Sequence, residues 1–137
     1  MPTRANPITD AHLAYAANGR GDGIAYVAGD EGAPRRISFR VERYPALLER
    51  EIGYAALIAA AESLRKAGHR RVRIAIGDRR IVDDLAARRD LPLPLSLLYV
   101  RLRCALNRFA RAEVVYRPFD EDLLARSRAE VALSTAA

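Results

Sequence analysis

The first third of the chain contains three short segments whose apolar residues are typical of β-strands. Short apolar runs at residues 12–15 and 24–28 flank a glycine-rich turn at residues 18–23, which is typical of a β-hairpin. At residues 36–41, apolar side chains alternate with polar ones, which predicts a half-buried third strand. The chain therefore opens with three antiparallel strands.

The period then lengthens, and helices and strands follow one another to the end of the chain. An alanine-rich stretch at residues 46–67 has apolar residues three and four positions apart, which predicts a helix, and Gly68 is placed to end it. The same patterns predict a strand at residues 72–76, helices at 81–88 and 96–110, a strand at 113–116, and a last helix capped by Asp120. The order β-β-β-α-β-α-α-β-α predicts an α/β domain with a five-stranded mixed sheet flanked by helices.

Length and composition indicate one globular domain. The 137 residues suit a single core, which we place at residues 10–137 after a flexible polar tail at residues 1–9. No apolar run approaches the roughly 18 residues of a membrane helix, and the first residues lack the apolar core of a secretion signal. The single Cys104 excludes an internal disulfide and a cysteine-based zinc site. We expect a cytoplasmic protein in which Cys104 is a small buried apolar side chain.

The charge is basic and is carried almost entirely by arginine. The net charge is +6, the computed pI is about 10.1, and Lys66 is the single lysine among 23 basic residues. Such a balance favours polyanions, and the guanidinium fork suits phosphate geometry, so we expect a nucleic-acid partner. The other interpretation is that arginine occupies surface positions that other proteins give to lysine.

Three local motifs resemble the ribonuclease H-like superfamily. Residues 76–85, IGDRRIVDDL, resemble its fourth strand, which ends on a metal-binding Asp before a small helix. Residues 54–58, YAALI, resemble its first long helix, and residues 115–117 followed by EDLLA at 121–125 resemble its last strand and last helix. The resemblance implies this fold over most of the chain and cleavage of the RNA strand of RNA–DNA hybrids by a pair of divalent cations.

Only part of the metal site that the resemblance implies is present in this sequence. Asp78 and Asp122 match two carboxylates that would bind Mg²⁺ or Mn²⁺, but the Asp of the first strand falls on Ala17 or Ala16. The Glu of the first helix falls on Gly53, and Glu51, two residues earlier, is rotated from it by about 200° on a helix.

The expected auxiliary His has no counterpart in residues 117–119 either. We therefore expect a depleted site with weak metal binding at best. Each remaining carboxylate also has a structural interpretation: Asp78 can cap the following helix, and Asp122 can face a helix dipole. Asp83 and Asp84 are expected on solvated helix surface.

Three functions remain open. The first is a nucleic-acid-binding domain with weak or no hydrolysis, and the arginines expected to contact phosphates are Arg20, Arg79, Arg80, Arg88, Arg89 and Arg117. The second is an active RNA–DNA hybrid endonuclease that uses Asp78, Asp122 and Glu51. The third is a protein-binding or dimerising scaffold that uses the helix at residues 96–110. The oligomeric state stays open.

Overall fold

The computed structural model describes residues 7–29, 32–41, 49–87, 91–93 and 95–136. Most of the expected tail, residues 1–6, lies outside the described residues, as do Arg88 and Arg89. Within the described part, the strands are β1 (Thr9–Ala17), β2 (Asp22–Ala28), β3 (Arg35–Arg40), β4 (Arg71–Ile76) and β5 (Arg111–Tyr116). The helices described there are α1 (Glu49–Lys66), α2 (Arg79–Ala87), α3 (Leu95–Leu106) and α4 (Glu121–Ala136).

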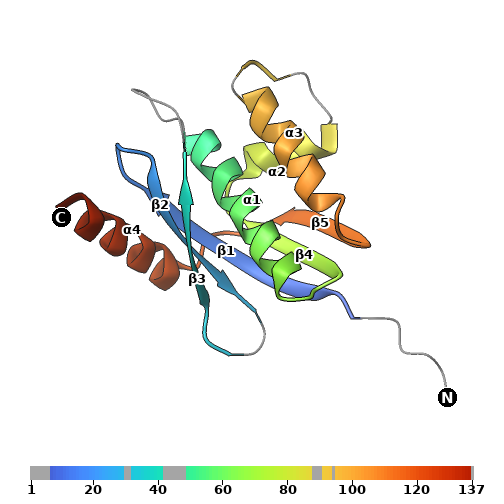
Figure 1. Ribbon diagram of the computed structural model, residues 1–137, viewed down its shortest axis with the longest axis horizontal. Coiled ribbons are helices and arrows are strands. Elements are labelled where there is room, and N and C mark those ends of the chain that lie inside the picture. The colour runs from blue at the N-terminus through green and yellow to red at the C-terminus, as the bar shows by residue number, and fades with distance from the viewer. Residues whose placement is uncertain (1–6, 30–31, 42–48, 88–90, 94, 137) are drawn as a thin grey trace.

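The strands form one mixed sheet in the order β3-β2-β1-β4-β5 (Figure 1). The opening strands β1, β2 and β3 pair antiparallel, whereas β4 pairs parallel with both β1 and β5. The predicted element order and the α/β class with a mixed sheet between helices are confirmed. Parallel pairing of β1 with β4 requires a crossover, which α1 supplies.

The first hairpin turns where the glycine-rich stretch predicts it. The Asn18 side-chain oxygen accepts hydrogen bonds from the backbone N–H groups of Arg20 and Asp22, at 2.9 and 3.1 Å. Gly21 has a φ of 86°, and a Cβ there would lie 2.1 Å from the carbonyl oxygen of Val41. The turn therefore requires glycine at position 21, both for its backbone conformation and for the close approach of the end of β3.

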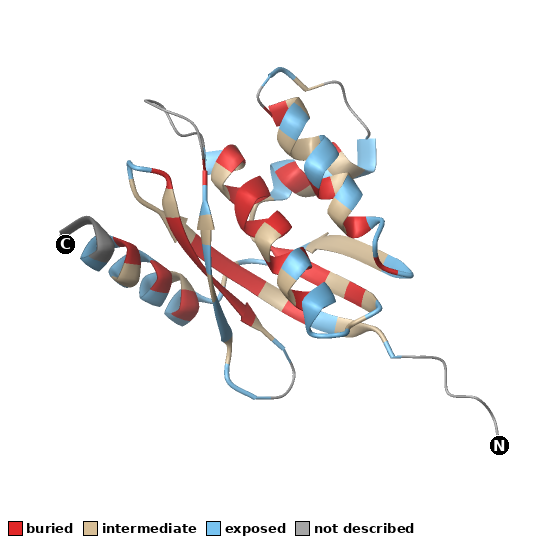
Figure 2. Cartoon of the chain, viewed as in Figure 1, coloured by how far each residue is buried: buried red, intermediate tan, exposed pale blue. Residues whose placement is uncertain are grey.

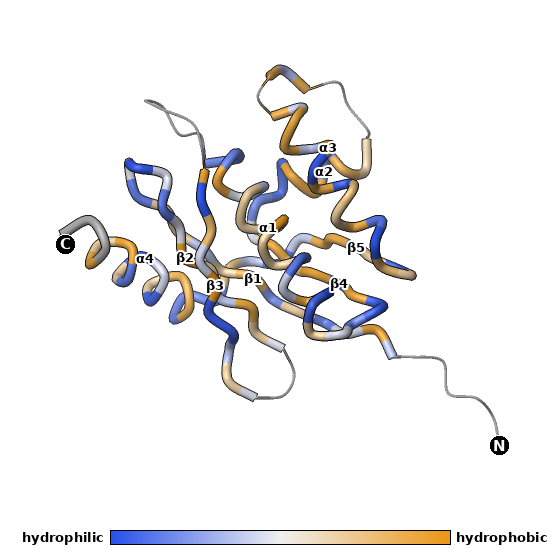
Figure 3. The backbone as a smooth tube through the Cα atoms, in the orientation of Figure 1, coloured by the Kyte–Doolittle hydropathy of each residue, from blue (hydrophilic) through white to orange (hydrophobic). Residues whose placement is uncertain are grey.

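Alternation along β1 divides the interior into two cores. Leu13 and Tyr15 join the larger core, which α1 and α3 cover, whereas Ala14 packs with Leu123 and Val131 of α4 on the opposite face. In Figure 2, buried segments run along the central strands and along the inner side of α1. Figure 3 shows hydrophobic residues interspersed with hydrophilic ones along the same strands, and hydrophilic residues at several of the turns. Successive side chains of β1 therefore pack on opposite faces of the sheet, and both faces are covered by helices.

The sequence predicts the end of α1 correctly but places the end of α3 too late. Gly68 ends α1 with a φ of 94°, and the N–H groups of Gly68 and His69 donate to the carbonyls of Arg65 and Leu64, so the predicted C-cap is confirmed. In contrast, α3 ends at Leu106 instead of residue 110. The N–H of Ala110 donates to the carbonyl of Arg70, which leads the chain into β5 at Arg111.

Two burial predictions were wrong. Asp84 is buried at 2% exposure, because the Tyr54 hydroxyl donates a 2.8 Å hydrogen bond to it and Arg50 lies 3.4 Å away. Cys104 is exposed, because its position on α3 faces an open cavity between α3 and α1 and not the core. A carboxylate at a helical core position is stable only with such partners, which lie thirty or more residues away in the sequence.

Among the described residues, no helix has the length and apolar character that crossing a bilayer requires.

We expect Tyr54→Phe to lower the free energy of unfolding by about 1–3 kcal/mol, because it leaves the buried Asp84 carboxylate without its hydroxyl donor. Chemical denaturation of the wild-type and variant proteins measures this difference. Tyr116→Phe is the matched control, since Tyr116 is 40% exposed, and it should change stability by less than about 0.5 kcal/mol. Equal effects of the two variants would contradict a stabilising role of the Tyr54–Asp84 bond.

Candidate functional site

A cavity of about 530 Å³ opens where β1 and β4 end side by side. Its walls come from β1, the first turn of α1, the β4–α2 junction, the end of β5 and the first half of α4. In open sheets, ligands bind beyond the carboxyl ends of parallel strands, where the connections leave in different directions. The position of this cavity makes it the candidate functional site.

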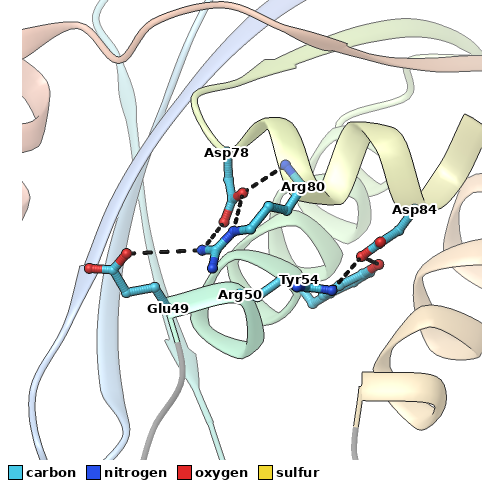
Figure 4. Close-up of polar contacts among 6 residues, drawn as sticks. All are labelled: Glu49, Arg50, Tyr54, Asp78, Arg80 and Asp84. Atoms are coloured by element: carbon cyan, nitrogen blue, oxygen red, sulfur yellow. Dashed lines mark hydrogen bonds and ion pairs between the residues drawn. The ribbon is translucent and has the colours of Figure 1, made fainter. Parts of the chain in front are cut away.

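Asp78 lies at the end of β4 and caps α2. Its Oδ1 accepts hydrogen bonds from the backbone N–H and the Nε of Arg80, at 3.0 and 3.1 Å, and its Oδ2 accepts from Arg80 Nη2 at 3.0 Å (Figure 4). Arg80 Nη2 also lies 4.0 Å from the Glu49 carboxylate. The hydrogen bonds that Arg80 donates to the Asp78 carboxylate raise the pKa of Arg80, which therefore stays charged. Both oxygens of Asp78 are thus bound to one guanidinium within its own helix turn.

Tyr15 and Phe119 form an apolar wall in this cavity. Their rings stack edge to face, with centroids 5.2 Å apart. A Cβ on Gly77 would lie 2.5 Å from Cδ2 of the Phe119 ring. On α1, a Cβ on Gly53 would lie 2.5 Å from Ile81 Cδ1 and 2.7 Å from the Tyr15 hydroxyl oxygen. Position 53 therefore accepts a larger side chain only if its neighbours move.

The structure places the sequence-predicted carboxylates apart. Ala16 and Ala17 line the cavity with side chains that have no ligand atom. Glu51 is buried on a different side of α1 and lines another cavity, as its offset of two residues from Gly53 predicts. Asp122 is exposed on the first turn of α4 and does not line the cavity. The cap of α4 is Asp120, whose Oδ1 accepts from the N–H groups of residues 122 and 123.

The donor set of the cavity does not fit two divalent cations. Mg²⁺ and Mn²⁺ bind several oxygen ligands in near-octahedral geometry. Among the described residues, no group of three or more His, Cys, Asp or Glu side chains could hold a metal ion. The carboxylates that line the cavity belong to Glu49 and Asp78, and both lie beside the Arg80 guanidinium.

Three of the described arginines line the cavity. Arg79 lies over the Tyr116 ring, with its guanidinium carbon 4.3 Å from the ring centre, and Arg80 and Arg128 also line the cavity. Arg128 was not among the arginines predicted from the sequence to contact phosphates. It lies four residues after Leu124, so both side chains are on the same face of α4, and both line the cavity. Arg20, at the tip of the β1–β2 turn, and Arg117, after β5, are exposed outside the cavity.

Comparison with known proteins identifies the fold. No protein-family model matches the chain, and no curated protein matches it in sequence. RNase H1 from the halophilic archaeon Halobacterium salinarum superposes with a TM-score of 0.70 at 20% identity, over 93% of this chain and 99% of that one.

Two further solved structures agree with this result. The N-terminal RNase H domain of a Mycobacterium tuberculosis protein has a TM-score of 0.67 at 18% identity, covering 88% of this chain and 95% of that one. LC11-RNase H1, solved in complex with an RNA/DNA hybrid, has a TM-score of 0.68 at 18% identity, covering 94% and 99%. The chain therefore has the ribonuclease H-like fold, and the predicted resemblance is confirmed at the level of the fold.

The buried phenol of Tyr15 makes a prediction about alkaline stability. Burial raises the pKa of Tyr15 above its ordinary value of 10.0, and the Asp78 charge raises it further. Above pH 10.0 the unfolded chain releases this proton while the folded chain keeps it, so the free energy of unfolding falls as the pH rises.

We expect Tyr15→Phe to reduce that slope by up to about 1.4 kcal/mol per pH unit. Denaturant titrations at pH values from about 8 to about 11 measure it. Tyr116→Phe, which removes an exposed tyrosine, should keep the wild-type slope. An unchanged slope in Tyr15→Phe would show that the Tyr15 hydroxyl is accessible to solvent in the folded protein.

Proposed function

We propose that this chain is a nucleic-acid-binding domain with a depleted two-metal site and weak or no hydrolysis of its own. One observation carries the proposal. Asp78, whose counterpart in the resemblance binds metal, instead holds the Arg80 guanidinium through both carboxylate oxygens. At the carboxyl ends of β1 and β4, a fixed cationic side chain thus lies where the resemblance implies metal ions.

The arginines of the cavity suit backbone phosphates. The pairing with Asp78 uses Nε and Nη2 of Arg80, which fixes the direction of the side chain while Arg80 stays about half exposed. Arg79 is oriented by the Tyr116 ring. Preordered guanidinium groups lose less entropy when they bind phosphate, and phosphate contacts are largely independent of base sequence. Of the similar structures, LC11-RNase H1 was solved with an RNA/DNA hybrid, which supports this ligand class.

The active-nuclease alternative requires Asp78, Asp122 and Glu51 to reach one point. Glu51 lines a different cavity and Asp122 is exposed outside this one. Asp78 would also have to release Arg80 before it could bind a cation, and a charge-assisted bidentate pair opposes that release. These separations favour the binding function over hydrolysis.

The first test measures hybrid binding against salt. We expect the affinity for a fluorescently labelled RNA–DNA hybrid to fall steeply between about 50 and 200 mM salt, because bound phosphates release counterions. Arg80→Gln and Arg128→Gln should each weaken binding and lower the slope of log K against log salt by about 1. Fluorescence anisotropy titrations supply both quantities.

Arg65→Gln is the matched control for these variants. It removes one exposed positive charge from the last turn of α1, at the end of that helix far from the cavity, and should leave the affinity nearly unchanged. An equal loss in all three variants would show that only net charge matters. Failure of the wild-type protein to bind the hybrid would favour the protein-binding alternative instead.

The second test concerns divalent cations. We expect the protein to bind the hybrid in EDTA, with Mg²⁺ and Mn²⁺ at about 5 mM weakening binding alike by competing for the phosphates. We also expect the hybrid to stay intact, because the described residues of the cavity lack the oxygen ligands that the two cations require. Denaturing gel electrophoresis after long incubation measures cleavage. Metal-dependent cutting that Asp78→Asn abolishes would overturn the proposal and establish the nuclease alternative.

A further inference from the structure

A second cavity, of about 450 Å³, lies between β3, α1 and α3 on the larger core's side of the sheet. Glu51, in the first turn of α1, lines it. The Glu51 side chain is 1% exposed, yet neither carboxylate oxygen has a hydrogen-bond partner among the described residues. An ionised carboxylate buried without partners costs several kcal/mol, so a side chain in this position calls for a compensating group.

Two neighbouring cations of the described chain are paired with other carboxylates, and Arg101, which lines the cavity, makes no hydrogen bond to Glu51. Arg50, the next residue on α1, pairs with Asp84 at 3.4 Å, and Arg40 on β3 pairs with Asp22 at 2.7 Å. The first turn of a helix favours a negative charge through the helix dipole, but this contribution is about 0.3–1 kcal/mol and falls short of the burial cost. The helix dipole alone therefore does not compensate the burial of a Glu51 carboxylate.

The rest of the cavity wall is mainly apolar. Its apolar lining includes Phe39, Val41, Ala55, Ile58, Leu97 and Leu98. The charged side chains of Arg40, Glu62 and Arg101 also line it, and all three residues are exposed. Ligand cavities of about 300–1,000 Å³ with apolar walls and one or two placed polar groups hold small organic molecules.

We propose that this cavity binds a small organic cation, with its ammonium or amidinium group paired to Glu51 and its apolar body against Phe39 and Leu98. The charge of the ligand supplies the partner that Glu51 lacks, and the apolar walls exclude water from the pair. This site is separate from the candidate nucleic-acid site, because the residues that line the two cavities do not overlap. The proposal therefore stands independently of hybrid binding.

Benzamidine and benzamide test the proposal on the full chain. The two molecules have nearly the same shape, but only benzamidine is a cation at neutral pH. We expect the wild-type protein to bind benzamidinium at least about tenfold more tightly than benzamide, measured by isothermal titration calorimetry. Glu51→Gln, which removes the charge and keeps the shape, should abolish this difference.

Asp83→Asn is the matched control, because it removes one exposed negative charge on α2 and should preserve the preference for benzamidinium. Equal binding of the two probes to the wild-type protein, or no binding of either at about 10 mM, overturns the proposal. A preference that survives Glu51→Gln also overturns it. If Glu51→Gln fails to fold, the comparison of the two probes on the wild-type protein, with chemical-shift changes at Phe39 and Leu98, decides the question.

Discussion

The parallel pairing of β1 with β4 is the constraint on which the rest of this structure depends. Its register, from Thr9 opposite Val72 to His12 opposite Ala75, directs both strands to the same edge of the sheet. Parallel strands cannot be joined by a tight turn, so α1 must cross one face and begin near that same edge. The ends of β1 and β4 and the start of α1 meet at one cavity because of this pairing.

Packing at this edge determines which chemistry the cavity can perform. The Tyr15 hydroxyl and the Ile81 side chain occupy the space beside Gly53, and Phe119 occupies the space beside Gly77. Aromatic and aliphatic side chains therefore fill the space next to these two glycines. Among the described residues, the charged groups that line the cavity are the Asp78–Arg80 pair, Glu49, Arg79 and Arg128, so three guanidinium groups stand against two carboxylates.

The fold could be predicted from the sequence because its signals are local. The alternation in β3, the alanine-rich period of α1 and the Gly68 cap each depend on neighbours within a few residues. The burial of Asp84 could not be predicted in this way, since it depends on a hydroxyl thirty positions away. For the site, the sequence predicted that Asp78 ends β4 and that the Glu51 side chain points away from Asp78. The bidentate pairing of Asp78 with Arg80 depends on the rotamers of both side chains, which no local sequence pattern encodes.

The Asp78–Arg80 pair also has a consequence for how this edge of the sheet responds to the surroundings of the protein. A bound metal ion supplies positive charge only in the fraction of molecules that have captured one, and this fraction follows the free ion concentration. A guanidinium is covalently part of every molecule, and its pKa, raised by Asp78, keeps it charged at any physiological pH. The positive charge of this cavity is therefore constitutive, and it is insensitive to chelators and to fluctuations in magnesium supply.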